Sequence, residues 1–303
     1  MESSALKHSK VVITGASGNL GSGLAARLAD AGIHQTLCDR TPPATDILDL
    51  PDVDFIACDL ENPDDLRDML QRHDILVHLA AHHGATKPKR SGEELWKLNV
   101  DGLFKTLQCA MDAGIRKLVY LSSMARHDPR SMYGLSKRIG EDLCQHLQHT
   151  LDLNFISVRP ASFTPWSDYL NGYGARLLYD RVHRDDVLDC VDLCVKYLLS
   201  QPHGAPTEGF AVNAVRANAY TDHDTSGWEK SPLALCESIF PGSRSIVQEF
   251  GLEIARRPST VSHLGAGKIG YSPKRHFGTF LDELAVHLEL HGKEYVKSLS
   301  CDY

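Results

Sequence analysis

One stretch near the N-terminus, Lys10 to Gly21 (KVVITGASGNLG), constrains the fold of this chain more than any other. Its apolar, β-branched start, Val11 to Thr14, is typical of a buried strand, and the run breaks at a glycine. An amphipathic pattern at helical spacing begins at Leu20, so the sequence predicts a strand, a glycine turn and a helix in that order. The first N–H groups of such a helix lack intrahelical partners, and the helix dipole makes that end positive. The stretch therefore predicts a cradle for a phosphate group.

Three glycines at three-residue spacing shape this cradle. Gly15 permits the tight turn, Gly18 lets a pyrophosphate approach the backbone, and Gly21 lets the helix pack closely on the strand. A second apolar strand, residues 34–38, ends in Asp39, whose carboxylate could accept both hydroxyls of an adenosine ribose. The combination predicts dinucleotide binding. The alternative is a glycine turn in an ordinary strand–helix unit.

Composition limits the partners of the chain. With 303 residues, 42% of them hydrophobic and 23% charged, it is typical of a soluble globular protein. A net charge of −7 without a basic block argues against general nucleic-acid binding. The sequence contains neither a signal peptide nor an apolar run of the roughly 18 residues that span a bilayer. Eight scattered cysteines without a C-x-x-C pair favour reduced thiols, so we expect a cytoplasmic protein with no membrane partner.

Apolar strand patterns and amphipathic helix patterns alternate along the first half of the chain. This alternation predicts right-handed crossovers and an α/β fold with a doubly wound parallel sheet, in which ligands bind beyond the carboxyl ends of the strands. Residues 40–51 and 82–91 read as loops. The predicted strands are 11–14, 34–38, 54–58, 74–81, 117–121 and 154–158, and the predicted helices begin near residues 20, 63, 93 and 133 and end near 31, 72, 113 and 150.

The pattern loosens after residue 160. We therefore expect residues 1–160 to form the NAD(P)-binding core, and residues 161–303 to complete the sheet and form a small substrate-binding cap. The second part is predicted to hold helices at 185–199, 232–240 and 277–289, a strand at 210–215 and an exposed loop at 216–230. In that loop Asp222-His223-Asp224 could ligate a metal, but a solvated loop is the preferred interpretation and no metal is predicted.

A second constellation lies at the fifth predicted strand and the helix that follows it. Tyr133 and Lys137 are four positions apart and so share one helix face. A free tyrosine titrates near pH 10, and an adjacent ammonium favours the phenolate. Ser123, at the tip of the strand, could bind the substrate oxygen and share its proton with Tyr133. Together the three residues predict an acid–base device for hydride-transfer chemistry, the alternative being surface residues of an amphipathic helix.

An ordered set of motifs along the whole chain resembles the extended short-chain dehydrogenase/reductases, also called the NAD-dependent epimerase/dehydratase family. The family pattern of phosphate turn, strand tips, catalytic helix and later signatures recurs in sequence order. The matching residues are Thr14-Gly-Ala-Ser-Gly-Asn-Leu-Gly21, Asp39, Asp59-Leu60, His78-Leu-Ala-Ala81, Asn99-Val-Asp-Gly102, Leu121-Ser-Ser123, Tyr133-x-x-x-Lys137, Arg159-Pro160, His183-Arg-Asp-Asp-Val187 and Ile269-Gly-Tyr-Ser-Pro273.

The resemblance implies a Rossmann-type fold that binds NAD(P), with Ser123, Tyr133 and Lys137 as catalytic residues, and it implies a homodimer. Asp39 favours NAD over NADP, because a 2′-phosphate would meet a negative charge there, although Arg40 could stack on adenine or tolerate NADP. The implied cofactor contacts are Gly15, Ser17, Gly18, Asn19, Leu20, Gly21, Asp39, Arg40, Asp59, Leu60, Leu79, Ala80, Ala81, Asn99, Ser122, Tyr133, Lys137 and Pro160.

Departures from the family pattern narrow the predicted reaction. Ser123 is followed by Met124-Ala125, where sugar-nucleotide dehydratases carry carboxyl groups, so dehydration loses its acid and base. The run 161–165 replaces the motif typical of sugar-nucleotide enzymes. The chain is therefore most similar to members that oxidise small sugars or sugar acids, such as uronate dehydrogenases, although those carry Asn-His after the catalytic serine. The candidate substrate contacts are His82, His83, Ser123, Ser162, Trp166 and Arg176, with a loop hydrogen bond as the alternative role for each histidine.

The sequence thus predicts an NAD-dependent oxidoreductase that transfers a hydride between nicotinamide and a secondary alcohol or ketone of a small sugar-like substrate. An epimerase that oxidises its substrate transiently is the first alternative. A non-catalytic NAD(P)-binding regulatory protein is the second.

Overall fold

The computed structural model describes residues 8–83, 89–163, 173–202 and 205–299. The chain divides into two compact units, and each is built from three separate segments. The first unit comprises residues 1–159, 188–213 and 264–271, and the second comprises residues 160–187, 214–263 and 272–303.

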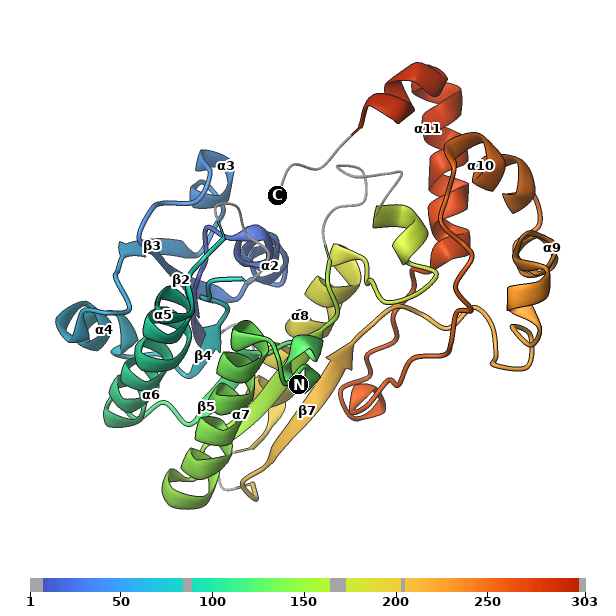
Figure 1. Cartoon of the computed structure of the whole chain (residues 1–303). Coiled ribbons are helices and arrows are strands. Elements are labelled where there is room, and N and C mark those ends of the chain that lie inside the picture. The colour runs from blue at the N-terminus through green and yellow to red at the C-terminus, as the bar shows by residue number, and fades with distance from the viewer. Residues whose placement is uncertain (1–7, 84–88, 164–172, 203–204, 300–303) are drawn as a thin grey trace. The chain divides into compact units, whose positions relative to one another are not determined.

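The first unit is built on one seven-stranded sheet (Figure 1). The neighbouring strands are parallel, and Thr14 at the end of the central strand pairs with Cys38 on one side and His78 on the other. The strand order is β3-β2-β1-β4-β5-β6-β7, so the chain moves outward from β1 and then restarts on its other side, which confirms the predicted doubly wound sheet. The strands are β1 (Lys10–Thr14), β2 (His34–Asp39), β3 (Val53–Ala57), β4 (Ile75–His78), β5 (Lys117–Leu121), β6 (Asn154–Pro160) and β7 (Gly209–Ala214).

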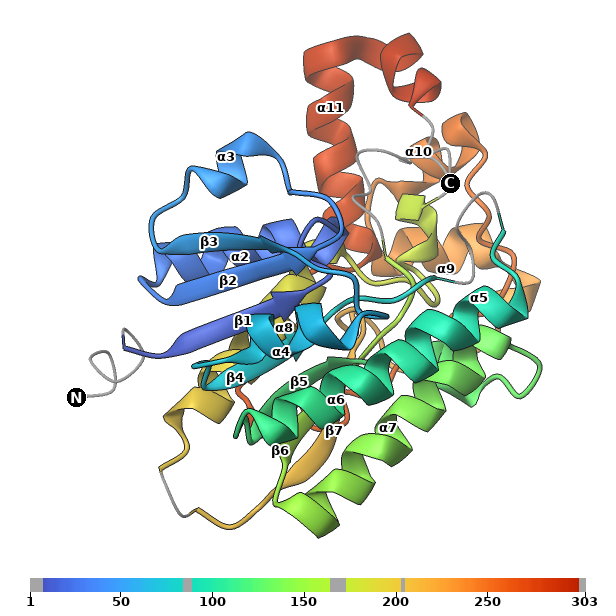
Figure 2. The ribbon, with the colours of Figure 1, turned by 90° about the vertical axis from the view of Figure 1, so that its left-hand side faces the viewer.

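Helices cover both faces of this sheet. In Figure 2, α6 and α7 lie side by side on one face, and α2 and α8 lie on the other, where Arg27 pairs with Asp189. The helical elements are α2 (Asn19–Asp30), α3 (Thr45–Leu48), α4 (Pro63–Leu70), α5 (Gly92–Trp96), the π-helix η1 (Lys97–Gly102), α6 (Leu103–Asp112), the 3-10 helix η2 (Met124–His127), α7 (Met132–Leu151), α8 (Arg184–Ser200) and the 3-10 helix η6 (Ala266–Lys268).

Local signals in the sequence explain most of these boundaries. Asn62 caps α4 by accepting a hydrogen bond from the Asp64 N–H at 3.1 Å, with proline at the first helical position. Gly114, with φ of 84°, ends the helix that began near residue 92. Residues 11–13 of β1 are fully buried, as expected of a central strand covered on both faces.

Three boundaries differ from the sequence prediction. β4 ends at His78 and not at residue 81. The neighbouring strand β1 stops at Thr14, whose carbonyl accepts the Leu79 N–H as the last bond between the two strands. The predicted loop 40–51 contains the short helix α3. The predicted single helix over 93–113 is interrupted by η1, a π-helical segment of the kind often found at functional sites.

The second unit is organised around an aromatic core. Trp228 and Phe277 are fully buried in it, and Phe280 packs so closely against Gly174 that a side chain there would overlap its ring. Its helices are α9 (Pro232–Ile239), α10 (Ser243–Phe250), α11 (Phe277–Ser298, kinked at Gly292) and the 3-10 helix η5 (Trp228–Lys230).

The prediction for this unit was wrong in two places. Residues 216–230 are not a uniformly exposed loop, because Arg216 and Thr225 are buried and the indole N–H of Trp228 donates to the Ile254 carbonyl at 2.6 Å. The helices differ as well: the segment 243–250 forms a helix that was not predicted, and α11 runs to Ser298 and not to residue 289. At residues 216–230 and 243–250, burial of side chains against distant segments decides the conformation, and short sequence windows contain no sign of it.

Candidate active site

The glycine turn after β1 has the geometry of a phosphate cradle. Gly15 has φ of 75°, and a Cβ there would lie 2.6 Å from the Ala80 nitrogen, so the close approach of β1 and β4 requires glycine. A Cβ at Gly21 would overlap the Gly15 carbonyl oxygen. Gly18 occupies the N-cap of α2 and has no side chain to fill the space before the first turn. The turn therefore fits the pyrophosphate of a dinucleotide, bound by N–H groups at the positive end of α2.

Asp39 stands beside this turn, at the end of β2. Its carboxylate accepts hydrogen bonds from the Ser17 N–H at 3.1 Å and from the Arg40 N–H at 2.7 Å. These bonds hold the carboxylate at the edge of the cradle, in a position that fits an acceptor for ribose hydroxyls. After β3, the Asp59 side chain is exposed and Leu60 is buried.

Lys137 is buried at the carboxyl end of β5. Its ammonium nitrogen donates to the Leu121 carbonyl at 2.7 Å and lies 5.8 Å from the centre of the Tyr133 ring. Only 2% of the residue is exposed, and this burial lowers the pKa of Lys137 to about 7. Burial therefore disfavours the charged form of this amine.

The Ser123 side chain lies close enough to the Tyr133 hydroxyl to influence its ionisation. Burial raises the pKa of Tyr133 to about 12, and Ser123 acts against that rise. The Ser123 hydroxyl oxygen also accepts the Ala125 N–H at 3.1 Å and so caps η2. Gly134, directly after the tyrosine, packs so tightly against the Ala125 carbonyl that a side chain would overlap it. Ser123, Tyr133 and Lys137, which the sequence analysis grouped as one site, are thus neighbours in the structure.

Asn99 ties the segment after β4 to α7. Its side-chain oxygen accepts the His82 N–H at 2.8 Å, and its amide donates to the His82 carbonyl at 2.9 Å and to the Ser136 hydroxyl at 3.1 Å. His83 then lies with its ring edge-on to Tyr133, 4.9 Å between ring centres. Burial, together with Arg90 and Arg40, lowers the pKa of His82. The π-helix η1 places Asn99 for this role.

Two more buried residues lie at the same end of the sheet: His78, which the sequence offered only as the first residue of a family motif, and Glu141, which it did not predict. His78 ends β4, shares a 3.0 Å hydrogen bond with the Thr14 hydroxyl, and has its pKa lowered to about 3 by burial and by Lys137. It is therefore neutral at physiological pH. Glu141 accepts the Ser122 hydroxyl proton at 2.5 Å. The one available sequence signal was its position four residues after Lys137 on α7.

The remaining predicted residues are placed as follows. Ser122 donates its hydroxyl to Glu141 and its backbone N–H to the Val158 carbonyl at 2.7 Å. Leu79 is buried, Ala80 lies beside the glycine turn, and Ala80 and Ala81 are partly exposed. Pro160 is the last residue of β6, and Ser162 follows that strand. In the second unit, Arg176 pairs with Asp180 at 2.8 Å. Trp166 lies outside the described residues.

Within residues 8–83, 89–163, 173–202 and 205–299, no group of three or more His, Cys, Asp or Glu side chains is arranged to hold a metal ion. In the loop 216–230, Asp222 accepts the Thr260 N–H and Asp224 accepts the Thr221 N–H. None of the helices in the described part of the chain is long and apolar enough to cross a bilayer.

Comparison with known proteins agrees with this geometry. Residues 11–165, half of the chain, match the model described as the NAD dependent epimerase/dehydratase family. A uronate dehydrogenase from Pseudomonas putida is 27% identical over 188 residues, which cover 56% of this chain and 67% of that protein. One from Pseudomonas syringae is 27% identical over 171 residues, 52% of this chain and 60% of that protein. An NAD-dependent glucose-6-phosphate dehydrogenase from Haloferax volcanii is 24% identical over 56% of this chain and 75% of its own.

Solved structures share the fold over nearly the whole chain. A uronate dehydrogenase from Agrobacterium tumefaciens superimposes with a TM-score of 0.61 at 21% identity, covering 92% of this chain and 89% of its own. A UDP-glucose 4-epimerase from Thermotoga maritima reaches 0.64 at 17% identity, covering 92% and 99%. At these identities the likeness establishes the Rossmann-type architecture.

Proposed function

We propose that this chain, which belongs to the NAD-dependent epimerase/dehydratase family, is an NAD-dependent oxidoreductase acting on a secondary alcohol or ketone of a small sugar or sugar acid. The observation that carries the proposal is the buried amine of Lys137, held by the Leu121 carbonyl 5.8 Å from the centre of the Tyr133 ring, with Ser123 beside the same phenol. Relatives named as dehydrogenases of a uronate and of glucose 6-phosphate support a small-sugar substrate. The family is NAD dependent by description, and Asp39 at the cradle disfavours a 2′-phosphate.

Each residue has a defined task in this proposal. Bound NAD supplies an acceptor for the hydride of the substrate. Ser123 donates or accepts a hydrogen bond at the substrate oxygen and holds it against the Tyr133 hydroxyl. Tyr133 acts in its phenolate form as the general base that takes the hydroxyl proton during oxidation, and returns it during reduction.

Lys137 makes that phenolate accessible. Burial opposes ionisation of Tyr133, so the phenolate needs a nearby positive charge. Because the pKa of Lys137 is about 7, protonation of its amine near neutral pH costs little free energy. The resulting ammonium, 5.8 Å from the ring centre, lowers the pKa of Tyr133. Lys137 and Asn99 are also proposed to face the cofactor ribose.

Among the substrate candidates, His83 contacts a proposed catalytic residue, through its ring contact with Tyr133. Neutral or charged, its ring nitrogens could bind a hydroxyl or carboxylate of the sugar. His82, Ser162, Trp166 and Arg176 stay predictions, as does the assignment of residues 161–303 to substrate binding.

The test follows NADH absorbance at 340 nm with a panel of free sugars, uronates and sugar nucleotides. We expect NADH to accumulate with a free sugar or sugar acid, and Tyr133→Phe to lower kcat by about 10²–10⁴-fold while the Kd for NAD stays within about threefold. Tyr295→Phe, at an exposed tyrosine of α11, is the matched control and should leave kcat unchanged. Near-normal turnover by Tyr133→Phe would refute the assignment. Interconversion of sugars without NADH would instead identify an epimerase.

A further inference from the structure

Helix α7 carries three functional side chains at four-residue spacing along one side. The first two are Tyr133 and Lys137, and the third is Glu141, which is 7% exposed. A carboxylate is rarely buried to this extent unless positive charges and hydrogen bonds compensate it.

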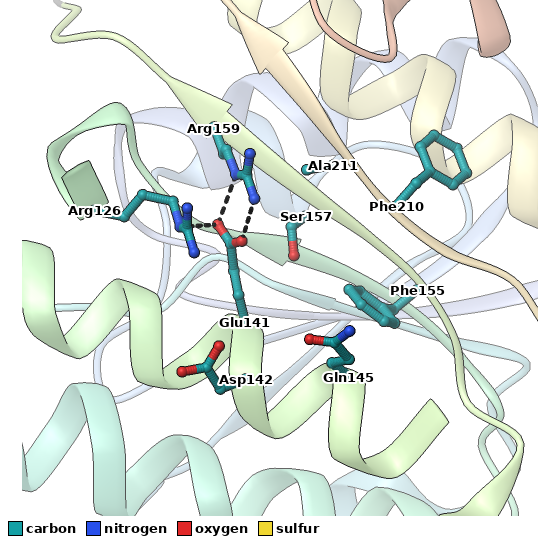
Figure 3. A pocket seen from close by; sticks show the side chains of 9 residues that line it. All are labelled: Arg126, Glu141, Asp142, Gln145, Phe155, Ser157, Arg159, Phe210 and Ala211. Carbon is teal, nitrogen blue, oxygen red and sulfur yellow. Dashed lines mark hydrogen bonds and ion pairs between the residues drawn. The ribbon is translucent and has the colours of Figure 1, made fainter. Parts of the chain in front are cut away.

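Three elements converge on this carboxylate, and Figure 3 shows the two arginines among its contacts. The Ser122 hydroxyl donates to Oε1 at 2.5 Å. Arg159 of β6 forms a bidentate pair, with Nε 2.9 Å from Oε1 and Nη2 2.5 Å from Oε2. Arg126 of η2 approaches with Nε 3.1 Å from Oε1. Glu141 therefore joins α7 to the tip of β5, to η2 and to β6.

Two of the residues that contact Glu141 lie on either side of Ser123 in the sequence. Ser122 directly precedes Ser123, and Arg126 follows it by three residues. Lys137 holds the carbonyl of Leu121 at the start of segment 121–127. The segment 121–127 is thus fastened to α7, the helix that presents Tyr133, on both sides of Ser123.

We propose that Glu141 is a positioning residue that holds Ser123 against Tyr133 by fastening segment 121–127 to α7. The kinetic part of this inference rests on the proposed function. Removal of the carboxylate leaves the buried Ser122 hydroxyl without its acceptor and leaves two guanidiniums, 18% and 14% exposed, without their shared counter-charge. The segment then relaxes away from α7, and a displacement of about 1 Å can cost about 10²-fold in rate.

A purely structural role gives a different expectation. If Glu141 served only to pair with Arg159 and so to join α7 to β6, the bond from Ser122 would add nothing to catalysis. Ser122→Ala removes that bond and leaves both ion pairs in place, so it separates the two roles. It also keeps the inference testable if a charge-removing substitution at Glu141 prevents folding.

The experiment compares Ser122→Ala, Glu141→Gln and the double variant with Asp142→Asn. Asp142 is the matched control because it is the neighbouring carboxylate on α7, lines the cleft of about 190 Å³ beside Glu141, and is exposed. We expect kcat to fall about 10–100-fold in each single variant, with the KM for NAD within about threefold, and the control to be unchanged. The double variant should lose less activity than the product of the two single losses, because both substitutions act on contacts of the same side chain.

A second measurement needs no turnover. The N–H groups of Arg126 and Asp128 donate to the carbonyls of Ser123 and Ala125 at 3.1 and 2.9 Å. Amide hydrogen exchange, followed by mass spectrometry on the protein without ligands, should be about tenfold faster over 122–128 in Ser122→Ala and unchanged in α6. If no sugar is turned over by the parent protein, the proposed function fails, yet this exchange still decides the inference. Unchanged exchange over 122–128, or an unchanged kcat in Ser122→Ala, would overturn it.

Discussion

The side-chain amine of Lys137 is buried and donates a hydrogen bond to the main-chain carbonyl of Leu121. Its environment disfavours the charged form, so the amine has a pKa of about 7 in the folded chain against an ordinary value of 10.5. Between these two pH values the unfolded chain binds a proton that the folded chain does not. The free energy of unfolding therefore rises with pH over this window through the contribution of Lys137.

A pH titration of stability tests this environment. From pH 7 to pH 9, Lys137 should add about 2 kcal/mol to the free energy of unfolding, a gain that Lys137→Met should lack. The measurement is urea denaturation of the parent protein and of Lys137→Met at both pH values. The difference between the two proteins removes the contribution of the other titrating groups. Parallel pH dependences in the two proteins would show that the amine is not held in its neutral form.

Residues with a local role were predictable, and residues with a long-range role were not. Gly15 and Asp39 lie at the ends of recognisable strands, so the sequence alone placed both at one cradle. Glu141 has no such signal, because its partners include Arg159, 18 residues away on a strand whose position depends on the whole sheet. Asn99 was named through the family motif, but its bond to Ser136, 37 residues away, has no sign in the sequence.

At the scale of elements, periodicity predicted the type of nearly every helix and strand in the first unit and missed features that depend on packing. The π-helical segment η1 interrupts a run whose sequence pattern predicts one amphipathic helix. It buries Asn99, and the contacts that favour this burial form only when the chain folds. The polar residues of 216–230 predicted an exposed loop, but Arg216 in this segment is buried. Arg216 is satisfied by Tyr220 and by the carbonyls of Tyr179 and Ser259.

The packing of α7 on β5 yields the next prediction. A Cβ at Gly140 would lie 2.5 Å from Cζ of Tyr120, a ring that is almost fully buried and cannot move aside. Overpacking costs about 1–3 kcal/mol, and the buried ring places this contact in the upper half of that range, whereas alanine in place of glycine in a helix gains about 1 kcal/mol. Gly140→Ala should therefore lower the free energy of unfolding by about 1–2 kcal/mol.

Gly267→Ala is the control for this substitution, because no atom outside its chain neighbours lies within 4 Å of the added Cβ. It should change stability by less than about 0.5 kcal/mol. Both values come from urea denaturation under identical conditions. A Gly140→Ala protein as stable as the parent would mean that α7 and β5 are further apart than the structure places them.

At the scale of the whole molecule, the two compact units are interleaved along the chain. The first unit needs residues 188–213 and 264–271 in addition to residues 1–159. Those later segments supply β7, which lies beside β6, and most of α8, which pairs with α2 through Asp189 and Arg27. The alternation of strand and helix patterns ends near residue 160, but the first unit also takes in chain segments beyond that point.

A fragment of residues 1–160 should therefore fail to fold by itself. It would expose β6 as an edge strand, lose the bond from the Phe155 N–H to the Glu208 carbonyl, and leave one face of the sheet without α8. We expect no cooperative urea transition and no binding of NAD, with both properties restored when the fragment is co-expressed with residues 161–303. The full chain under the same conditions is the reference. A cooperative transition of the isolated fragment at the midpoint of the full chain would show that β7 and α8 are dispensable, and that the nucleotide-binding core is complete within its first 160 residues.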